Sequence, residues 1–250
     1  MRIHKKEAFL TAPDAVLFDT DNTIYDYPAA DEAGKRAVRD KVTTTLSITG
    51  TDFNAAYLEA RRQVKARLIG TASSHSRLLY LQRMLEIMGL GSQVLLALDF
   101  EQTYWRTFLS SAELFPGVKS LLDDIRLLRI PISIVTDLTA QIQFRKIVYF
   151  GLDQYFDYIV TSEEVGHDKP HQAPFEIAVE KMQPQGKCIW MIGDDATNDI
   201  WGGRRAINAV TLQKVHGKNK VGVGEEEPDC SFEKFDDIQT LLKKILREGL

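Results

Sequence analysis

The sequence of 250 residues is poor in cysteine and lacks any long apolar run. Its two cysteines, Cys188 and Cys230, lie in unlike surroundings and are too few for a disulfide framework. No uninterrupted apolar segment could cross a bilayer. The apolar fragment after the basic N-terminal residues, residues 8–10, is far shorter than the core of a signal peptide. We therefore expect a cytoplasmic protein with no membrane partner.

An excess of charge of one sign is also missing. The chain has 31 basic and 35 acidic residues, a formal charge of -4, and no basic run dominates it. There is no electrostatic reason to expect nucleic acid as a partner. The apolar and charged shares, 44% and 26%, are those of a globular protein. The length suits one α/β domain with a large insertion or two modest domains, and the oligomeric state stays open.

Short apolar runs typical of strands recur between helical patterns. They lie at residues 15–18, 132–135, 158–160, 187–192 and 209–212. Because strands and helices alternate in this way, the sequence predicts an α/β fold with a doubly wound parallel sheet.

Residues 29–111 show helical periodicity and almost no strand signal. One apolar stripe steps by three, four and three residues through Leu78, Leu81, Leu85 and Met88. The simplest interpretation is a helical subdomain inserted after the first strand. We place the main domain at residues 1–24 and 113–250, and the helical insertion at residues 25–112.

The segment AVLFDTDNTIYDY, residues 15–27, places Asp19 and Asp21 directly after the first strand. Residues two apart on an extended segment point the same way, so the two carboxylates can converge where open α/β sheets bind ligands. Such a pair is tolerable if a divalent cation lies between the carboxylates or if one is protonated. On this segment alone, exposed turn residues are the alternative. An EF-hand calcium loop is excluded because Ile24 and Ala30 stand where glycine and glutamate are needed.

Three further segments carry side chains suited to the same site. ISIVTD contains Thr136, GHDKPHQAPF contains Lys169 before a proline, and CIWMIGDDATNDI contains Asp194, Asp195 and Asp199. Taken singly, each has an ordinary explanation as a helix cap, a surface lysine or acids that match a helix dipole. Their order after successive strands favours one shared site.

With DTDNT, IVTD, GHDKP and GDDATND in this order, the chain resembles the haloacid dehalogenase-like (HAD) superfamily, whose four short motifs these look like. The resemblance covers residues 14–27 and about 113–247, and the helical insertion lies where the family has its helical cap. It implies a Rossmann-like core. Thr20 and Asp137 depart from the bulky apolar residue and the asparagine that are usual in the family, which bears on the substrate more than on the chemistry.

The resemblance implies a Mg²⁺-dependent phosphatase. Asp19 would be the nucleophile that forms an aspartyl-phosphate, Asp21 the general acid and base, and Thr136 and Lys169 donors to phosphate oxygens. The substrate would be a small phosphorylated metabolite, such as a sugar phosphate, a phosphoglycolate-like acid or a nucleotide monophosphate. Dehalogenases of the family lack the second acid because a halide leaving group needs no proton, so Asp21 favours a phosphatase.

The same resemblance implies the metal ligands. Mg²⁺ would be held by the Asp19 carboxylate, the backbone carbonyl of Asp21 and the Asp194 carboxylate, with Asp195 and Asp199 behind them. In the insertion, His75 and Arg77 of GTASSHSRL are candidate substrate contacts, although a plain interhelical loop explains them as well.

Other functions stay open on the sequence. A phosphomutase of the same family is one alternative. A phospho-acceptor or binding protein with no net turnover is another, although receivers of that kind lack a long helical insertion after their first strand.

Overall fold

The computed structural model describes residues 1–248, and the chain divides into two compact units. The first unit comprises Met1–Tyr25 and the chain from Leu114 onwards, and the second comprises Asp26–Glu113. The sequence analysis placed each of the two crossings one residue earlier, after residues 24 and 112.

The first unit is built on a parallel sheet. Its strands in the described residues are β1 (Arg2–Ile3), β2 (Ala15–Phe18), β3 (Ile132–Thr136), β4 (Tyr158–Thr161), β5 (Ile189–Gly193), β6 (Val210–Lys214) and β7 (Cys230–Phe232). They form one seven-stranded sheet in the order β1-β7-β6-β5-β2-β3-β4. Neighbours pair in parallel, except that β1 and β7 are antiparallel. The predicted α/β fold class is confirmed. The sequence did not reveal β1 and β7, because two or three residues are too few to show an alternating pattern.

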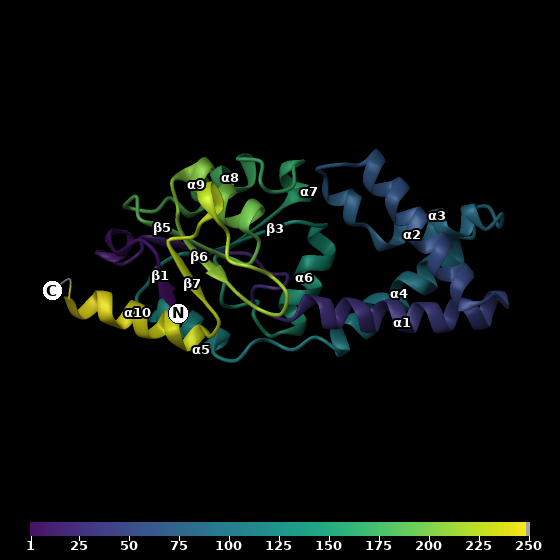
Figure 1. Ribbon diagram of the computed structural model, residues 1–250, viewed down its shortest axis with the longest axis horizontal. Coiled ribbons are helices and arrows are strands. Elements are labelled where there is room, and N and C mark those ends of the chain that lie inside the picture. The colour runs from purple at the N-terminus through teal and green to yellow at the C-terminus, as the bar shows by residue number, and fades with distance from the viewer. Residues whose placement is uncertain (249–250) are drawn as a thin grey trace. The chain divides into compact units, whose positions relative to one another are not determined.

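Helices cover both faces of this sheet. They are α5 (Val118–Leu127), α6 (Ala140–Tyr149), α7 (Ser162–Val165), α8 (Ala173–Met182), α9 (Gly202–Ile207) and α10 (Phe235–Glu248), with a π-helix, η3 (Ala196–Trp201), after β5. Short 3-10 helices are η1 (Lys6–Phe9) and η4 (Gly224–Glu226). Figure 1 shows α8 and α9 on one face and α5 and α10 on the other. Under α8 the core includes Leu17, Phe175 and Met191, all fully buried.

Strand β2 lies at the centre of the sheet, between β5 and β3. All four of its residues are buried, as expected for a strand covered on both faces. From β2 the chain continues to β3 and β4 on one side and later returns to β5 on the other side. The carboxyl end of β2 is therefore the topological switch point, where open α/β sheets bind ligands.

The chain leaves the first unit and returns to it at adjacent positions. Tyr25 and Leu114 form an isolated antiparallel bridge, and the Phe115 N–H donates to the Ile24 carbonyl oxygen at 2.9 Å. Gly117 then precedes α5 with φ +85°, and a Cβ there would lie 2.6 Å from Asp236 Oδ1, so glycine is required.

The second unit consists of helices. They are α1 (Tyr27–Leu46), α2 (Gly50–Arg67), α3 (Arg77–Ile87) and α4 (Val94–Ser110), with the 3-10 helix η2 (Ala72–His75) before α3. Helix α1 packs along α4, and α2 along α3. Thr49 and Asp52 form a capping box at the start of α2, and Ser76 caps α3 by accepting from the Leu79 N–H. Local polar signals thus set the starts of α2 and α3.

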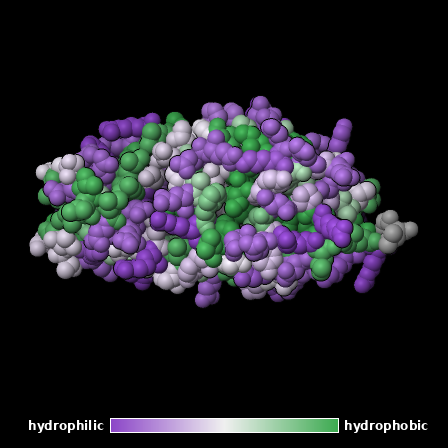
Figure 2. Space-filling view, turned by 180° about the vertical axis from the view of Figure 1, so that it is seen from behind, coloured by the Kyte–Doolittle hydropathy of each residue, from purple (hydrophilic) through white to green (hydrophobic). Residues whose placement is uncertain are grey.

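Apolar side chains also reach the surface of the molecule. Figure 2 shows hydrophobic residues mixed with hydrophilic ones on the face that it draws, and the most exposed large apolar residues include Leu95 and Leu127. Among the described residues, none of the helices is both long enough and apolar enough to span a bilayer. Cys188 and Cys230 are free thiols.

Candidate active site

A buried lysine joins two carboxylates at the carboxyl end of β2. Asp19 follows β2 directly, and its N–H donates to the Ile192 carbonyl oxygen of β5 at 2.9 Å. Lys169 Nζ donates to Asp19 Oδ1 at 2.7 Å and to Asp199 Oδ1 at 2.6 Å. The second oxygen of Asp19 accepts from Thr23 Oγ1 at 2.9 Å. Residues far apart in the sequence therefore meet at the switch point of the sheet.

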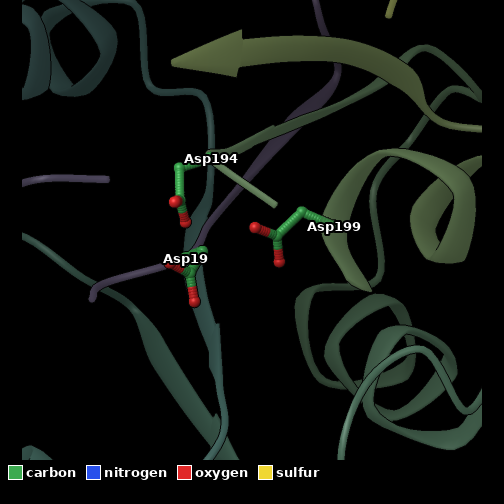
Figure 3. Close-up of side chains that lie close together, drawn as sticks. All are labelled: Asp19, Asp194 and Asp199. Atoms are coloured by element: carbon green, nitrogen blue, oxygen red, sulfur yellow. The ribbon is translucent and has the colours of Figure 1, made fainter. Parts of the chain in front are cut away.

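Asp194, the first residue after β5, adds a third carboxylate. One oxygen from each of Asp19, Asp194 and Asp199 lies within 4.8 Å of the others, and Figure 3 shows the three side chains converging. Three carboxylates and one lysine leave a formal charge of -2 when all are ionised. Hard carboxylate oxygens are the donors that Mg²⁺ prefers, so the charge and chemistry of this group fit a magnesium ion.

The acids of this group hold protons more tightly than free aspartates do. Burial raises the pKa of Asp194 to about 7, and the Asp19 carboxylate adds to the rise. Burial also raises the pKa of Asp19 and of Asp199, although Lys169 acts against it. Burial by itself would lower the pKa of Lys169, but Asp19 and Asp199 outweigh it and raise that pKa well above its usual value. The lysine therefore stays charged. One ammonium group does not balance the negative charge of the three carboxylates.

Neighbouring groups hold Asp194 and Asp199 in place. Asn22 Nδ2 donates to Asp194 Oδ2 at 2.7 Å, and the Asp195 N–H donates to Asp199 Oδ2 at 3.0 Å. Gly193 lets Asp199 approach β5, since a Cβ at residue 193 would lie 2.3 Å from Asp199 Oδ2. A larger residue at position 193 would displace the carboxylate that Lys169 binds.

Thr136 ends β3 with its hydroxyl in a buried polar cluster. Its Oγ1 lies 2.7 Å from Thr20 Oγ1 and accepts from Gln143 Nε2 at 2.8 Å. Asp137 Oδ1 accepts from the Lys169 backbone N–H at 2.9 Å, and burial raises the pKa of Asp137 to about 6 although Lys169 opposes the rise. Thr20 and Asp137, which both depart from the family pattern, thus contact other residues of the candidate site.

Asp21 reaches solvent more than its neighbours do. Its side chain is 30% exposed, whereas that of Asp19 is 8% exposed. Lys146 Nζ of α6 donates to Asp21 Oδ1 at 2.7 Å and to Oδ2 at 2.9 Å, and the Tyr25 hydroxyl donates to Oδ1 at 2.6 Å. The second acid is thereby separated from the Lys169 group and held by partners of its own.

A family model for the haloacid dehalogenase-like hydrolases matches residues 13–206 of the chain. The chain belongs to this family. It is 36% identical over 202 residues to the ribulose-1,5-bisphosphate 5-phosphatase of Halopiger xanaduensis, a match that covers 80% of this chain and 83% of that protein. It is 27% identical over 236 residues to the glyceraldehyde 3-phosphate phosphatase of Methanopyrus kandleri, a match that covers 92% and 98% of the two chains.

Solved structures of HAD proteins share the fold. The HAD-hydrolase YfnB from Bacillus subtilis, bound to magnesium, matches with a TM-score of 0.65 and 24% identity over 91% of this chain and 97% of that one. A 2-haloacid dehalogenase from Pseudomonas syringae matches with a TM-score of 0.71 and 20% identity over 92% and 98%. The predicted HAD family and Rossmann-like core are confirmed, and so is the predicted enzyme class, a phosphoric monoester hydrolase.

The side chain of Asp195 lies apart from the acidic group of this HAD hydrolase. Its Oδ1 accepts from the N–H groups of Thr197 and Asn198 at 2.9 and 2.7 Å, so it caps the π-helix. Its backbone N–H, and not its carboxylate, contacts Asp199. The helix-cap explanation fits Asp195 better than the predicted place of its carboxylate behind the metal ligands.

His75 and Arg77 lie in the second unit. Arg77 is buried there: its guanidinium donates to the Tyr27 hydroxyl, to Asp31 Oδ1 at 3.3 Å and to the His75 carbonyl oxygen at 2.7 Å. Burial alone would raise the pKa of Asp31, but Arg77, Lys35 and the Tyr104 hydroxyl together outweigh it and lower that pKa. This geometry favours a structural role for Arg77. The contact of His75 or Arg77 with substrate stays a prediction.

Sequence reasoning missed two residues of α6 that reach the site, Gln143 and Lys146. Both are buried on the same helix face as Ile142 and Ile147. Two polar residues three positions apart within an apolar stripe are the signal that could have found them.

Proposed function

We propose that this HAD hydrolase is a cytoplasmic, Mg²⁺-dependent phosphatase that hydrolyses a small phosphorylated sugar through an aspartyl-phosphate on Asp19. The observation that carries the proposal is the position of Lys169, which bridges Asp19 and Asp199 beside Asp194 at the switch point. A buried carboxylate with an ammonium group at 2.7 Å can approach a phosphate dianion that it would otherwise repel.

The relatives support the substrate class. One is named for the 5-phosphate of a ribulose bisphosphate, and four are named glyceraldehyde 3-phosphate phosphatases. We therefore favour a sugar or triose phosphate over the phosphoglycolate-like acids and nucleotide monophosphates that the sequence also allowed.

In the first step, an Asp19 oxygen attacks phosphorus and the bond from phosphorus to the sugar oxygen breaks. Asp21, protonated, gives its proton to that oxygen, so the sugar leaves as an alcohol and Asp19 carries the phosphoryl group. Lys169 and Thr136 donate to the non-bridging oxygens, whose charge they partly neutralise.

In the second step, a water molecule attacks the aspartyl-phosphate. Asp21, now ionised, takes a proton from the water, and the bond from phosphorus to the Asp19 oxygen breaks. Hydrogen phosphate leaves and both aspartates return to their starting forms. The sum is one phosphate ester and one water converted to one alcohol and one phosphate.

Asp19, Asp194 and the backbone carbonyl of Asp21 would hold Mg²⁺, with Asp199 behind them through Lys169. When bound, the ion supplies positive charge that offsets the negative charge of the three acids and the phosphate dianion. Asn22 and Gly193 contribute by fixing the Asp194 and Asp199 side chains. We propose that the helical insertion, with His75, selects among phosphorylated substrates.

The test is a panel of phosphorylated metabolites with free phosphate as the readout. Ribulose 1,5-bisphosphate, glyceraldehyde 3-phosphate, phosphoglycolate and a nucleotide monophosphate are compared with Mg²⁺ and with EDTA. We expect release from a sugar phosphate that EDTA abolishes and that Asp19→Asn lowers to background. Asp153→Asn, an identical change at an exposed loop aspartate, should keep full activity.

Three results would contradict this function. Full activity of Asp19→Asn or in EDTA would exclude the proposed chemistry. Phosphate that migrates on the sugar without release would identify a mutase. Stable labelling of Asp19 at one phosphate per chain, without turnover, would identify a phospho-acceptor.

A further inference from the structure

We propose that Lys146 and Tyr25 are positioning residues that fix the Asp21 carboxylate for its work on the leaving group. This inference rests on the proposed role of Asp21 as general acid and base. Neither residue belongs to a sequence motif, and neither has a part in the two steps above.

The contacts define the orientation of the carboxylate. Lys146 Nζ lies 2.7 Å from Asp21 Oδ1 and 2.9 Å from Oδ2, so one ammonium group spans both oxygens. The Tyr25 hydroxyl donates to Oδ1 at 2.6 Å, and Thr20 Oγ1 donates to the same oxygen at 3.3 Å. Three donors, one from α6 and two from the segment that also carries Asp21, restrict the rotation of a side chain that is otherwise free to turn.

Lys146 and Tyr25 are more deeply buried than the Asp21 carboxylate that they contact. The side chain of Lys146 is 1% exposed, whereas that of Asp21 is 30% exposed. The carboxylate can therefore meet a ligand while its two main partners stay out of reach of solvent. Burying an ammonium group is costly, and an apolar residue would fill the same position on α6 more cheaply if packing were all that it did.

The surroundings keep the two partners rigid. Lys146 lies three residues after Gln143, which holds Thr136 from the same helix face. Tyr25 is fully buried, and its ring packs against Phe150 with centroids 5.1 Å apart. The ammonium group of Lys146 lies 5.8 Å from the centre of the Tyr25 ring. Helix α6 thus supports both proposed reacting ends of the site, the phosphate-binding hydroxyl and the acid.

A positioning role predicts a dependence on the leaving group. A sugar oxygen needs a proton as it departs, whereas 4-nitrophenolate leaves without one. Because kcat/KM reports the steps up to the first irreversible departure, a misplaced Asp21 should lower kcat/KM for a sugar phosphate and spare it for 4-nitrophenyl phosphate. The second step needs the base for both substrates, so kcat should fall with either one.

The experiment compares Lys146→Met and Tyr25→Phe with Asp21→Asn as the reference. The substrates are 4-nitrophenyl phosphate and the sugar phosphate with the highest kcat/KM in the panel above. For Lys146→Met we expect kcat/KM to fall about 10- to 100-fold with the sugar phosphate, within the range of a general acid, and by less than about threefold with the aryl ester. Tyr25→Phe, which removes one hydroxyl, should show the same selectivity at a smaller size. The aryl ester should also give a burst of nitrophenol followed by slow turnover.

Lys214→Met is the matched control. Lys214 is an equally buried lysine, on β6, and its ammonium group donates to the Val215 carbonyl oxygen at 3.1 Å. This variant tests whether the loss of any buried lysine produces the leaving-group selectivity. Its ratio of kcat/KM for the sugar phosphate to kcat/KM for 4-nitrophenyl phosphate should match that of the wild type. If Lys146→Met does not fold, Tyr25→Phe and Lys146→Arg, which keeps the charge, decide the question, and Lys146→Arg should restore much of the selectivity.

The outcomes separate the inference from the proposed function. Suppose that Asp21→Asn shows the leaving-group selectivity, but that Lys146→Met and Tyr25→Phe lower kcat/KM equally for the two substrates or do not lower it. The positioning role is then wrong, and the proposed function stands. If Asp21→Asn itself shows no selectivity, the proposed acid is wrong and the inference ends with it.

Discussion

Replacing Asp194 with asparagine should make the metal-free protein more stable, although it removes a proposed metal ligand. Asp194 lies beside Asp19 and Asp199, and burial, followed by the Asp19 carboxylate, raises its pKa from 3.8 to about 7. Asparagine has nearly the same shape and keeps an oxygen that can accept from Asn22 Nδ2. The substitution therefore removes a repelled charge and little else.

The size and sign of the effect follow from proton linkage. Between about pH 4 and pH 7 the folded state binds a proton that the unfolded state has lost, so stability falls as pH rises and the penalty is complete above pH 7. Three pKa units at about 1.4 kcal/mol each set an upper limit of about 4 kcal/mol. Since Asp194 is only half-buried and its surroundings relax, we expect about 2 kcal/mol at pH 8, or a rise in Tm of about 4–8 °C. At pH 4.5 the gain should be below about 1 kcal/mol.

Thermal unfolding in EDTA at pH 8 and at pH 4.5 measures this gain, with Asp153→Asn as the control. Mg²⁺ should then reverse the order, because an ion at a hundred times its Kd adds about 2.7 kcal/mol to the wild type, and a variant that lacks one ligand should gain less than about 0.7 kcal/mol at the same concentration. An Asp194→Asn protein that is no more stable than the wild type in EDTA at pH 8, or that gains as much at pH 4.5, would refute the reasoning.

Three further substitutions test other parts of the structure. Gly193→Ala places a Cβ 2.3 Å from Asp199 Oδ2, so kcat/KM should fall at least about 100-fold in the phosphate-release assay. Arg77→Met leaves the Asp31 carboxylate with Lys35 as its cationic partner and should lower the free energy of unfolding by about 1.5–3 kcal/mol in urea. Thr49→Ala removes the capping box of α2 and should lower the free energy of unfolding by about 1 kcal/mol. Thr49→Asn should keep most of the stability.

Each of these has a result that would contradict it. A Gly193→Ala enzyme with wild-type kcat/KM would show that Asp199 need not lie against β5. Arg62→Met, at an exposed pair with Glu59, should change stability little, and an equal loss at Arg62 and Arg77 would remove the argument from burial. If Thr49→Asn were as unstable as Thr49→Ala, the cap hydrogen bond would not be the cause.

The sequence predicted the parts of the site that follow strands directly. Asp19, Thr136 and Asp194 come at the ends of apolar runs, and the topology of a parallel sheet brings such ends to one edge. Lys146 gave no such signal, because its partner Asp21 is 125 residues away and a lysine on a helix is usually exposed. Asp199 was expected behind the metal ligands, and its contact with Lys169 is compatible with that position. Its approach to within 4.8 Å of Asp19 and Asp194 depends on tertiary packing, because Asp199 lies against Gly193 of β5.

The paired crossing at Tyr25 and Leu114 has a consequence for how such proteins diversify. Since the outgoing and incoming segments are joined to each other by the bridge and by the Phe115 N–H, the distance between them is set by the core and not by what is inserted beyond them. Segments of other lengths could be inserted between these two positions without moving the proposed catalytic aspartates. Evolution, or an engineer, could then change substrate choice and leave the reaction chemistry intact.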